Sequence, residues 1–248
     1  MKTDEEHQKL YTDAIRHAGL EGENAFQSWF NRSEDIHQAI VRGFWDLAFH
    51  ILTPQVCALI EQPEDKTALE IGYGGGRILN AACNSFKSVI GVDVHSEQVA
   101  VRDFLHAQGK TNFTLLRTSG RTLDVNLESV DFVYSFIVLQ HLPSLDVFQS
   151  YIQETYRCLK PRGVAQLYFG KYSKIHWIEQ ARYWCQGYKE ISDVPVNFTS
   201  LVVRTALVKQ LCRRAGFRVV ANGTSYKQAP DGYPLRPGGQ NYVSVVKL

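Results

Sequence analysis

Long apolar runs are missing from this 248-residue sequence, and none approaches the roughly eighteen residues needed to span a bilayer. The first residues, Met1 to Glu6, are polar and carry no apolar segment of the kind found in secretory signals. Charge of one sign is equally scarce, since 27 basic residues face 25 acidic ones and no run rich in Lys or Arg occurs. We therefore expect a soluble, cytoplasmic protein that binds neither a membrane nor a nucleic acid.

Paired cysteines are also missing. The five cysteines are an odd number, are widely separated and form no C-x-x-C motif, which argues against both a zinc site and a disulfide framework. We expect them to be small buried apolar residues in a reducing compartment, with one reactive thiol as the alternative. They are Cys57, Cys83, Cys158, Cys185 and Cys212.

The pattern of apolar residues changes near residue 63. Before it, apolar positions recur at helical spacing, most clearly over 33–52, where Ser33 is expected to open a helix with Glu34 and Asp35 in its first turn. We expect a helical N-terminal cap region over 1–62 and a ligand-binding domain over 63–248. The size and apolar content favour a single core.

From Thr67 onward, short β-rich runs alternate with segments of helical spacing. Such alternation predicts a parallel sheet with helices on both faces, an α/β fold. The expected strands are 67–72, 88–94, 112–118, 130–138, 163–171, 218–226 and 241–248, and the expected helices are 76–86, 96–109, 144–160 and 200–217.

An aromatic segment without strand character follows the fifth of these strands, over 171–198. Its rings are interpreted either as core and helix-packing material or as a helical, lid-like insertion over a small substrate.

Four glycines crowd the turn after the first predicted strand: Gly72, Gly74, Gly75 and Gly76. In open α/β sheets ligands bind at such a strand-to-helix turn, and glycine lets backbone N–H groups approach a ligand without an intervening Cβ. A merely tight turn is the alternative, but it needs fewer glycines. The dinucleotide pattern G-x-G-x-x-G would require glycine where the chain has Arg77, which disfavours NAD.

Glu70, two residues before the first glycine, indicates the charge of the ligand. A pyrophosphate would be repelled by this carboxylate, whereas a ligand with a sulfonium and an ammonium group would not. The stretch Glu70-Ile71-Gly72-Tyr73-Gly74-Gly75-Gly76 resembles the first motif, E/D-x-G-x-G-x-G, of the class I S-adenosylmethionine-dependent methyltransferases.

The resemblance continues over about residues 67 to 170. Asp93 matches the acid that accepts hydrogen bonds from the ribose hydroxyls, with Val94 against the adenine; the alternative is that Asp93 only caps the next helix. Asp131 and Ser135 fall in the fourth motif, and "CLKPRG" is similar to the family's L-K-P-G-G turn with Arg162 in place of a glycine. The cofactor contacts that it implies are Glu70, Gly72, Tyr73, Gly74, Gly76, Asp93, Val94, Ser119, Gly120, Ser135 and Phe136. Ser119 is a departure, because the family usually has an acid there.

The resemblance also implies a Rossmann-like sheet of seven strands, mostly parallel, whose last strand, 241–248, is inserted antiparallel. The cofactor would be S-adenosyl-L-methionine. No metal is implied, since "SGRTLD" and its neighbours lack clustered carboxylates.

His141 follows the fourth predicted strand, where the acceptor pocket of the family meets the cofactor. A neutral imidazole there suits proton removal from a hydroxyl or ammonium acceptor, so His141 is the candidate catalytic base. The alternative is that its ring only shapes the loop by local hydrogen bonds. Weaker candidates, more simply read as packing residues, are His176, Trp177, Tyr11, Trp29 and Arg42.

The long aromatic segments over 1–62 and 171–198 favour an enclosed, mostly apolar acceptor pocket. We therefore expect an enzyme that methylates oxygen, nitrogen or carbon of a small molecule in a biosynthetic reaction. The alternatives are a protein that binds S-adenosylmethionine without methyl transfer and, with less support, a protein methyltransferase.

Overall fold

Seven short segments pair into one sheet because each is a run of apolar and β-branched residues. In the computed structural model, which describes residues 3–31, 35–171, 183–192, 194–225 and 239–248, their order is β3-β2-β1-β4-β5-β9-β8. β9 pairs antiparallel with β5 and β8, and the pairs from β3 through to β5 are parallel, which confirms the predicted sheet. The strands are β1 (Thr67–Ile71), β2 (Ser88–Asp93), β3 (Phe113–Arg117), β4 (Val130–Ser135), β5 (Leu159–Phe169), β8 (Phe217–Thr224) and β9 (Asn241–Lys247).

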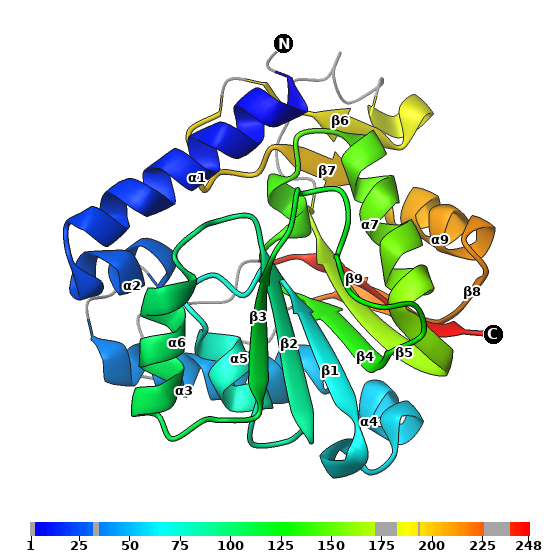
Figure 1. Cartoon of the computed structure of the whole chain (residues 1–248). Coiled ribbons are helices and arrows are strands. Elements are labelled where there is room, and N and C mark those ends of the chain that lie inside the picture. Colours follow the sequence, from blue (N-terminus) through cyan, green and yellow to red (C-terminus); the bar gives the residue numbers. More distant parts are fainter. Residues whose placement is uncertain (1–2, 32–34, 172–182, 193, 226–238) are drawn as a thin grey trace.

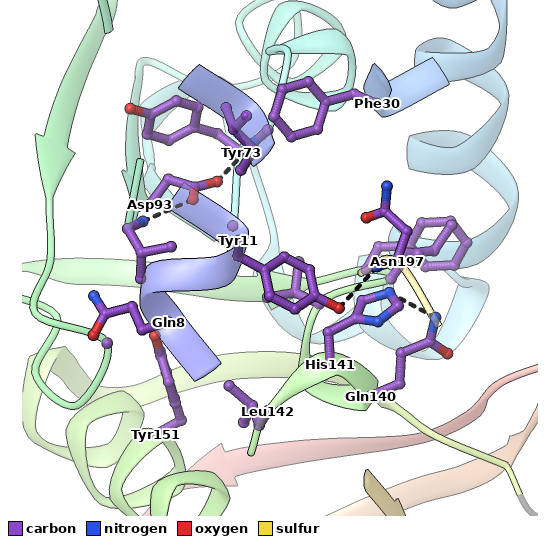
Figure 2. A pocket seen from close by; sticks show the side chains of 18 of the residues that line it. Gln8, Tyr11, Phe30, Tyr73, Asp93, Gln140, His141, Leu142, Tyr151 and Asn197 are labelled. Carbon is purple, nitrogen blue, oxygen red and sulfur yellow. Dashed lines mark hydrogen bonds between the residues drawn. The ribbon is translucent and has the colours of Figure 1, made fainter. Parts of the chain in front are cut away.

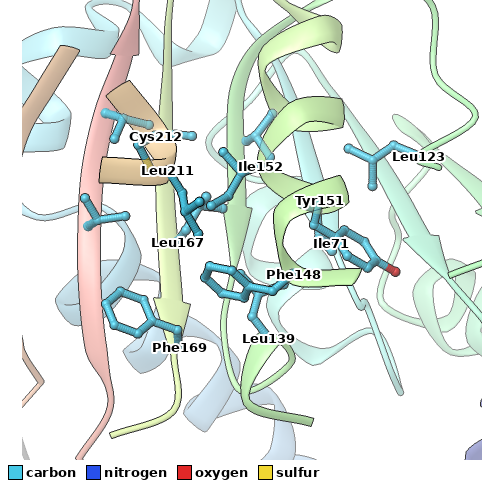
Figure 3. Packing of buried hydrophobic residues seen from close by; sticks show 14 of the residues in the cluster. Ile71, Leu123, Leu139, Phe148, Tyr151, Ile152, Leu167, Phe169, Leu211 and Cys212 are labelled. Carbon is cyan, nitrogen blue, oxygen red and sulfur yellow. The ribbon is translucent and has the colours of Figure 1, made fainter. Parts of the chain in front are cut away.

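Helices cover both faces of this sheet (Figure 1). The central strands are buried on both sides, so Leu69 and Ile71 point into one hydrophobic cluster while Ala68 points into the other. Figure 3 shows the first cluster, where Phe148 and Ile152 pack between the sheet and its covering helices. The helices of that face are α7 (Leu145–Cys158) and α9 (Thr205–Arg214); the other face has α5 (Arg77–Ala82) and α6 (Gln98–Ala107).

The N-terminal segment is helical, as predicted. Thr3 and Glu6 form a capping box at the start of its first helix. Asp35 is the N-cap of the helix expected from Ser33, because its carboxylate accepts from the backbone N–H of His37 at 2.9 Å, so Asp35 does not lie in the first turn. The elements are α1 (Asp4–Leu20), α2 (Glu23–Asn31), α3 (Ile36–Asp46), the π-helix η1 (Leu47–Ile51), α4 (Pro54–Ile60) and the 3₁₀-helix η2 (Pro63–Asp65).

These helices share one hydrophobic cluster with the sheet. α3 lies so close to α5 that a Cβ on Gly43 would overlap the backbone of Arg77. In the described part of the chain no single helix is long and apolar enough to cross a membrane. Ile36–Ile51 and Pro54–Ile60 reach that length and composition only together, as a pair bent by 81°.

The segment after β5 differs from its prediction. Tyr188–Glu190 (β6) and Leu201–Val203 (β7) form a small antiparallel sheet, so the insertion is not purely helical and α9 begins at Thr205 rather than near residue 200. Two adjacent β-branched valines favour the strand, and Arg204, in extended conformation, is the N-cap of α9. α1 and this small sheet lie at the same end of the molecule (Figure 1).

Candidate functional site

A cavity of about 950 Å³ opens where the carboxyl ends of β1, β2 and β4 meet. Its volume lies near the top of the range of roughly 300–1,000 Å³ that is typical of small-molecule sites. Figure 2 shows side chains from α1, from the strand ends and from the loop before β7 converging on it. The cavity therefore occupies the switch-point region where α/β sheets bind their ligands.

The glycine turn after β1 forms one wall of this cavity. Gly72 and Gly74 have φ angles of +76° and +52°, in the left-handed region that glycine adopts without strain. A Cβ on Gly72 would overlap the side chain of Val138, and one on Gly74 would come within 2.8 Å of the ring of Phe30. Both glycines are thus required by conformation and by close packing.

Asp93, the last residue of β2, fixes the position of this turn. Its Oδ2 accepts from the Gly74 backbone N–H at 2.8 Å, and its Oδ1 accepts from the Val94 N–H at 2.7 Å (Figure 2). The N-cap of α6 is Glu97, so the alternative in which Asp93 caps that helix is wrong. A carboxylate offers about four lone-pair directions, so each oxygen keeps capacity for a ligand hydroxyl.

His95 holds the same turn from its other side and was missed in the sequence. Its Nδ1 accepts from the Glu97 N–H at 3.1 Å, so its Nε2 carries the proton and donates to the Gly74 carbonyl at 3.1 Å. Both polar groups of Gly74 are therefore fixed. The only sequence signal was its position, two residues after Asp93.

Glu70 lines the cavity from β1 but is almost entirely buried, with 3% of its surface exposed. The Tyr134 hydroxyl donates to its Oε2 at 3.1 Å. Burial raises the pKa of Glu70 to about 8, although the Tyr134 hydrogen bond and the positive charge of Arg77 oppose that rise. Near neutral pH this carboxyl is mostly protonated.

Most of the predicted cofactor contacts line the cavity. Gly76 and Ser135 do not: Gly76 faces α6, where a Cβ would lie 2.9 Å from Val101, and the Ser135 side chain is completely buried. Contact of these two residues with the cofactor stays a prediction. The predicted residues in the wall are Glu70, Gly72, Tyr73, Gly74, Asp93, Val94, Ser119, Gly120, Phe136 and His141.

α1 closes the cavity with one face. Asp4, Gln8, Tyr11 and Ile15 all line it, and their spacing of three to four residues is the signal that could have identified this face. Gln8 lies over Gly120, on which a Cβ would come within 3.3 Å of the glutamine side chain. Of the weaker candidates, Tyr11, Trp29 and Arg42 line the cavity, while His176 and Trp177 lie outside the described residues.

His141 ends the 3₁₀-helix η3 (Leu139–His141), in the cavity wall opposite Asp93 (Figure 2). Its Nδ1 lies 2.8 Å from the Phe198 carbonyl and its Nε2 lies 3.0 Å from Nε2 of Gln140. The His7 ring on α1 hydrogen-bonds the His141 carbonyl at 2.8 Å. Both ring nitrogens of the candidate base thus have defined partners.

The charged side chains at the cavity are largely paired. Arg77 forms a buried ion pair with Asp46, and Arg121 bridges Asp4 and Asp146 near the start of α1. Within the described residues no group of three or more His, Cys, Asp or Glu side chains could hold a metal ion.

Comparison with known proteins gives a family-model match for part of the chain and a fold. Residues 69–167 match the family model described as a methyltransferase domain. A SAM-dependent methyltransferase from Methanosarcina mazei is similar in structure, with a TM-score of 0.58 and 19% identity over 79% of this chain and 98% of that one. A Galdieria sulphuraria protein provisionally named a sarcosine dimethylglycine methyltransferase has a TM-score of 0.60 and 16% identity, over 86% of this chain and 88% of that one.

The same fold also occurs in the [4+2]-cyclase SpnF, with a TM-score of 0.58 and 13% identity over 84% of this chain and 80% of that one. No curated protein sequence matches the chain. The family model covers the glycine turn, Asp93 and the loop after β4, which are among the parts of the chain that line the cavity. Residues 69–167 therefore match a methyltransferase domain, and the chain has the fold of S-adenosylmethionine-dependent methyltransferases.

Proposed function

We propose that this enzyme transfers the methyl group of S-adenosylmethionine to an oxygen, nitrogen or carbon atom of a small molecule held in the 950 Å³ cavity, in a biosynthetic reaction. The observation that supports this proposal best is that α1 covers part of the cavity. The helix is tied down by the Tyr11 hydroxyl, which accepts from the Asn197 N–H at 3.1 Å, and by His7 on the His141 carbonyl. A protein or nucleic-acid acceptor would need an open surface, and a nucleic acid would also need a basic one.

The described residues fit the cofactor. Asp93 has lone pairs to spare for two ribose hydroxyls, the glycine turn leaves no Cβ between its backbone and a ligand, and Glu70 offers a buried carboxyl to an ammonium group. Val94, Ser119 and Gly120 would form the adenine end of the site. When bound, S-adenosylmethionine supplies an electrophilic methyl group on a positively charged sulfur.

The protein contributes chiefly position and dryness to such a reaction. Displacement at the methyl carbon requires nucleophile, carbon and sulfur in line, and alignment in an enclosed cavity can account for much of the lowering of the barrier. If the acceptor is a hydroxyl or an ammonium, its proton must also leave. His141 is the proposed base, because its ring lies in the cavity wall and Nε2 can take that proton once the Gln140 amide, which lies 3.0 Å from it, turns away.

A second reading is that the chain binds S-adenosylmethionine without transferring its methyl group. It is favoured by one observation: a protein of the same fold, SpnF, is a [4+2]-cyclase, so the fold alone does not fix the reaction. A protein acceptor is the weaker alternative, because α1 would have to move away from the cavity.

Calorimetry with S-adenosylmethionine and its demethylated product tests the cofactor, and formation of that product with panels of small hydroxyl, amine and carbon acceptors tests the transfer. We expect binding of both cofactor forms and turnover with at least one small acceptor. A folded protein that binds neither form would overturn the proposal. If the protein binds both cofactor forms but methylates only proteins, it is a protein methyltransferase. If it binds both forms and methylates no acceptor, it binds S-adenosylmethionine without methyl transfer.

His141→Gln separates a base from a structural histidine. With a hydroxyl or ammonium acceptor, loss of the base is expected to lower kcat by about 10²- to 10⁴-fold while the Kd of S-adenosylmethionine changes little. His106→Gln, on the exposed end of α6, is the matched control. An unchanged kcat in His141→Gln would show that His141 is not the base and that its ring only shapes the loop.

A further inference from the structure

Two glutamine side chains join His141 to the backbone at the end of β4. The Ile137 N–H donates to Oε1 of Gln240 at 3.3 Å, and Nε2 of Gln240 donates to Oε1 of Gln140 at 2.7 Å. Nε2 of Gln140 then lies 3.0 Å from Nε2 of His141, whose Nδ1 lies 2.8 Å from the Phe198 carbonyl. The result is an unbroken row of four hydrogen bonds.

The two ends of this row fix its direction. The backbone N–H of Ile137 can only donate, and the carbonyl of Phe198 can only accept. Each amide between them has one donating and one accepting end, so both must point the same way along the row. It follows that Nε2 of His141 is an unprotonated acceptor and that Nδ1 carries the proton of the neutral ring.

The surroundings hold both amides in place. Gln240 is only 3% exposed, and its backbone carbonyl accepts from the Ser225 backbone N–H at 2.8 Å. The backbone carbonyl of Gln140 accepts from the Ser200 backbone N–H at 2.9 Å. Ile137, at the far end, has a φ angle of +60°, which is a strained conformation for a β-branched residue.

We propose that Gln140 and Gln240 are positioning residues that hold His141 in its Nδ1-protonated form and link proton uptake at Nε2 to the backbone of Ile137. The proposal rests on the proposed function, in which His141 is the base. Nε2 has one lone pair, so the Gln140 N–H must first turn away from it. When the acceptor's O–H or N–H bond then breaks, its proton forms a new N–H bond at Nε2 and Nδ1 keeps its own. Gln240 must follow the turn of Gln140, and the Ile137 N–H loses its acceptor.

The relay thus ends in the cavity wall, where Ile137 lies beside Phe136 and Val138. Protonation of the base and the conformation of a strained residue at the ligand site are coupled by two side-chain amides, of which Gln240 is buried and Gln140 partly buried. From α1, His7 and Tyr11 face His141, with 5.9 Å between the Tyr11 and His141 ring centres. The charged or ionisable side chains that other parts of the cavity wall contribute are Glu70, Tyr73, Asp93, Arg42, Arg77, Arg121, Tyr151 and Lys171.

Nitrogen–proton correlation NMR on protein labelled with ¹⁵N-histidine tests the tautomer without cofactor or acceptor. We expect the proton of His141 on Nδ1, with the signal assigned by its loss in His141→Gln. His95 is an internal reference of the opposite kind, since the Glu97 N–H and the Gly74 carbonyl fix its proton on Nε2. A His141 ring that is neutral and protonated on Nε2 would overturn the proposal.

Gln240→Glu tests the relay. The introduced carboxylate can accept from the Ile137 N–H but cannot donate to Gln140, so Gln140 must turn its oxygen toward His141. We expect the proton of His141 to move to Nε2 and the midpoint of its titration to rise by about one unit or more. The acidic limb of the pH profile of kcat should move by the same amount, with little change in KM for S-adenosylmethionine.

Gln8→Glu is the matched control, because it adds the same charge to the cavity wall outside the relay. It should leave the His141 tautomer unchanged. If Gln240→Glu does not fold, Gln240→Met removes the amide, and His141 should then populate both tautomers. An unchanged His141 tautomer in a folded Gln240 variant would overturn the proposal, whereas the expected NMR result without any methyl transfer would overturn only the proposed function.

Discussion

Glu70 and Tyr134 lie side by side on β1 and β4, and the Tyr134 hydroxyl donates to the Glu70 carboxyl at 3.1 Å in a completely buried environment. Because burial outweighs this hydrogen bond, the pKa of Glu70 rises to about 8. The folded protein therefore retains a proton that the unfolded chain has already lost above about pH 4.5.

The sign of the resulting pH dependence follows from that raised pKa. Stability from the protonated Glu70 is fully present below pH 4.5 and is lost as pH rises through about 8. We expect the free energy of unfolding of the ligand-free protein to fall over this range by an amount on the order of 4 kcal/mol, measured by urea denaturation at a series of pH values. Glu70→Gln should flatten the decline.

Tyr134→Phe should extend the decline to higher pH, since its hydroxyl lowers the pKa of Glu70. Tyr168→Phe is the control, because that buried hydroxyl donates to the His50 carbonyl at 2.6 Å and has no carboxyl partner. Tyr168→Phe should lower the free energy of unfolding at every pH without moving the pH range over which it declines. If the free energy of unfolding of Glu70→Gln falls with pH as steeply as that of the parent, a group other than Glu70 causes the decline.

Binding of S-adenosylmethionine should release a proton. An ammonium group near Glu70 favours the ionised carboxylate, so at about pH 7 binding should expel up to one proton per site. Calorimetry in two buffers of different ionisation enthalpy measures this release. The demethylated product has the same ammonium group and should behave alike, whereas methylthioadenosine, which lacks it, should release none. Proton release that persists in Glu70→Gln would contradict the assignment.

Much of the fold could be predicted because its signals are local. Runs of apolar residues bounded by turns, such as 67–71, identify buried strands, and the glycine turn with Asp93 identifies where their ends meet. β6 and β7 escaped prediction because three-residue strands have no periodicity to detect. Leu201–Val203 was assigned to a helix by its apolar neighbours in α9.

The candidate site was predictable only along single elements. Glu70, Asp93 and His141 each follow or end a predicted strand, whereas Gln140 and Gln240 are a hundred positions apart and come together only because β9 inserts beside β5. His95 gave no motif, because its role depends on the exact geometry of Gly74. Arg162 is a position where the sequence motif did indicate the local geometry. It replaces a glycine of the L-K-P-G-G turn and adopts the φ angle of +65° that glycine would favour.

Arg77 and Asp46 form an ion pair that joins α5 to α3, and Asp46 is only 2% exposed. Arg77→Met leaves this buried carboxylate with Arg42 at 3.7 Å and His50 at 3.8 Å as its nearest ionic partners. We expect a loss of about 3 kcal/mol in urea denaturation, at the lower end of the usual cost because those partners remain. The pKa of Glu70 should also rise further, since Arg77 lowers it.

Arg157→Met is the matched control for that prediction. Its partner Glu154 lies one turn away on α7, and the Arg157 side chain is 36% exposed. Such a pair is worth about 0–1 kcal/mol, so the variant should be nearly neutral. If Arg77→Met and Arg157→Met lose the same free energy of unfolding, burial of the Asp46 carboxylate does not explain the cost of breaking the Arg77–Asp46 pair.

Asp93→Ala should weaken binding of S-adenosylmethionine by roughly several tens-fold at least, because two charge-assisted hydrogen bonds to the ribose and the restraint on Gly74 are lost together. Asp131→Ala is a close control. Asp131 is also a strand carboxylate with two donors, the Thr67 N–H and the Lys160 ammonium, both at 2.9 Å, but it is absent from the cavity wall. It should lower stability and leave the Kd from calorimetry unchanged. If both variants weaken binding equally, the effect comes from the sheet and not from a contact between Asp93 and the ligand.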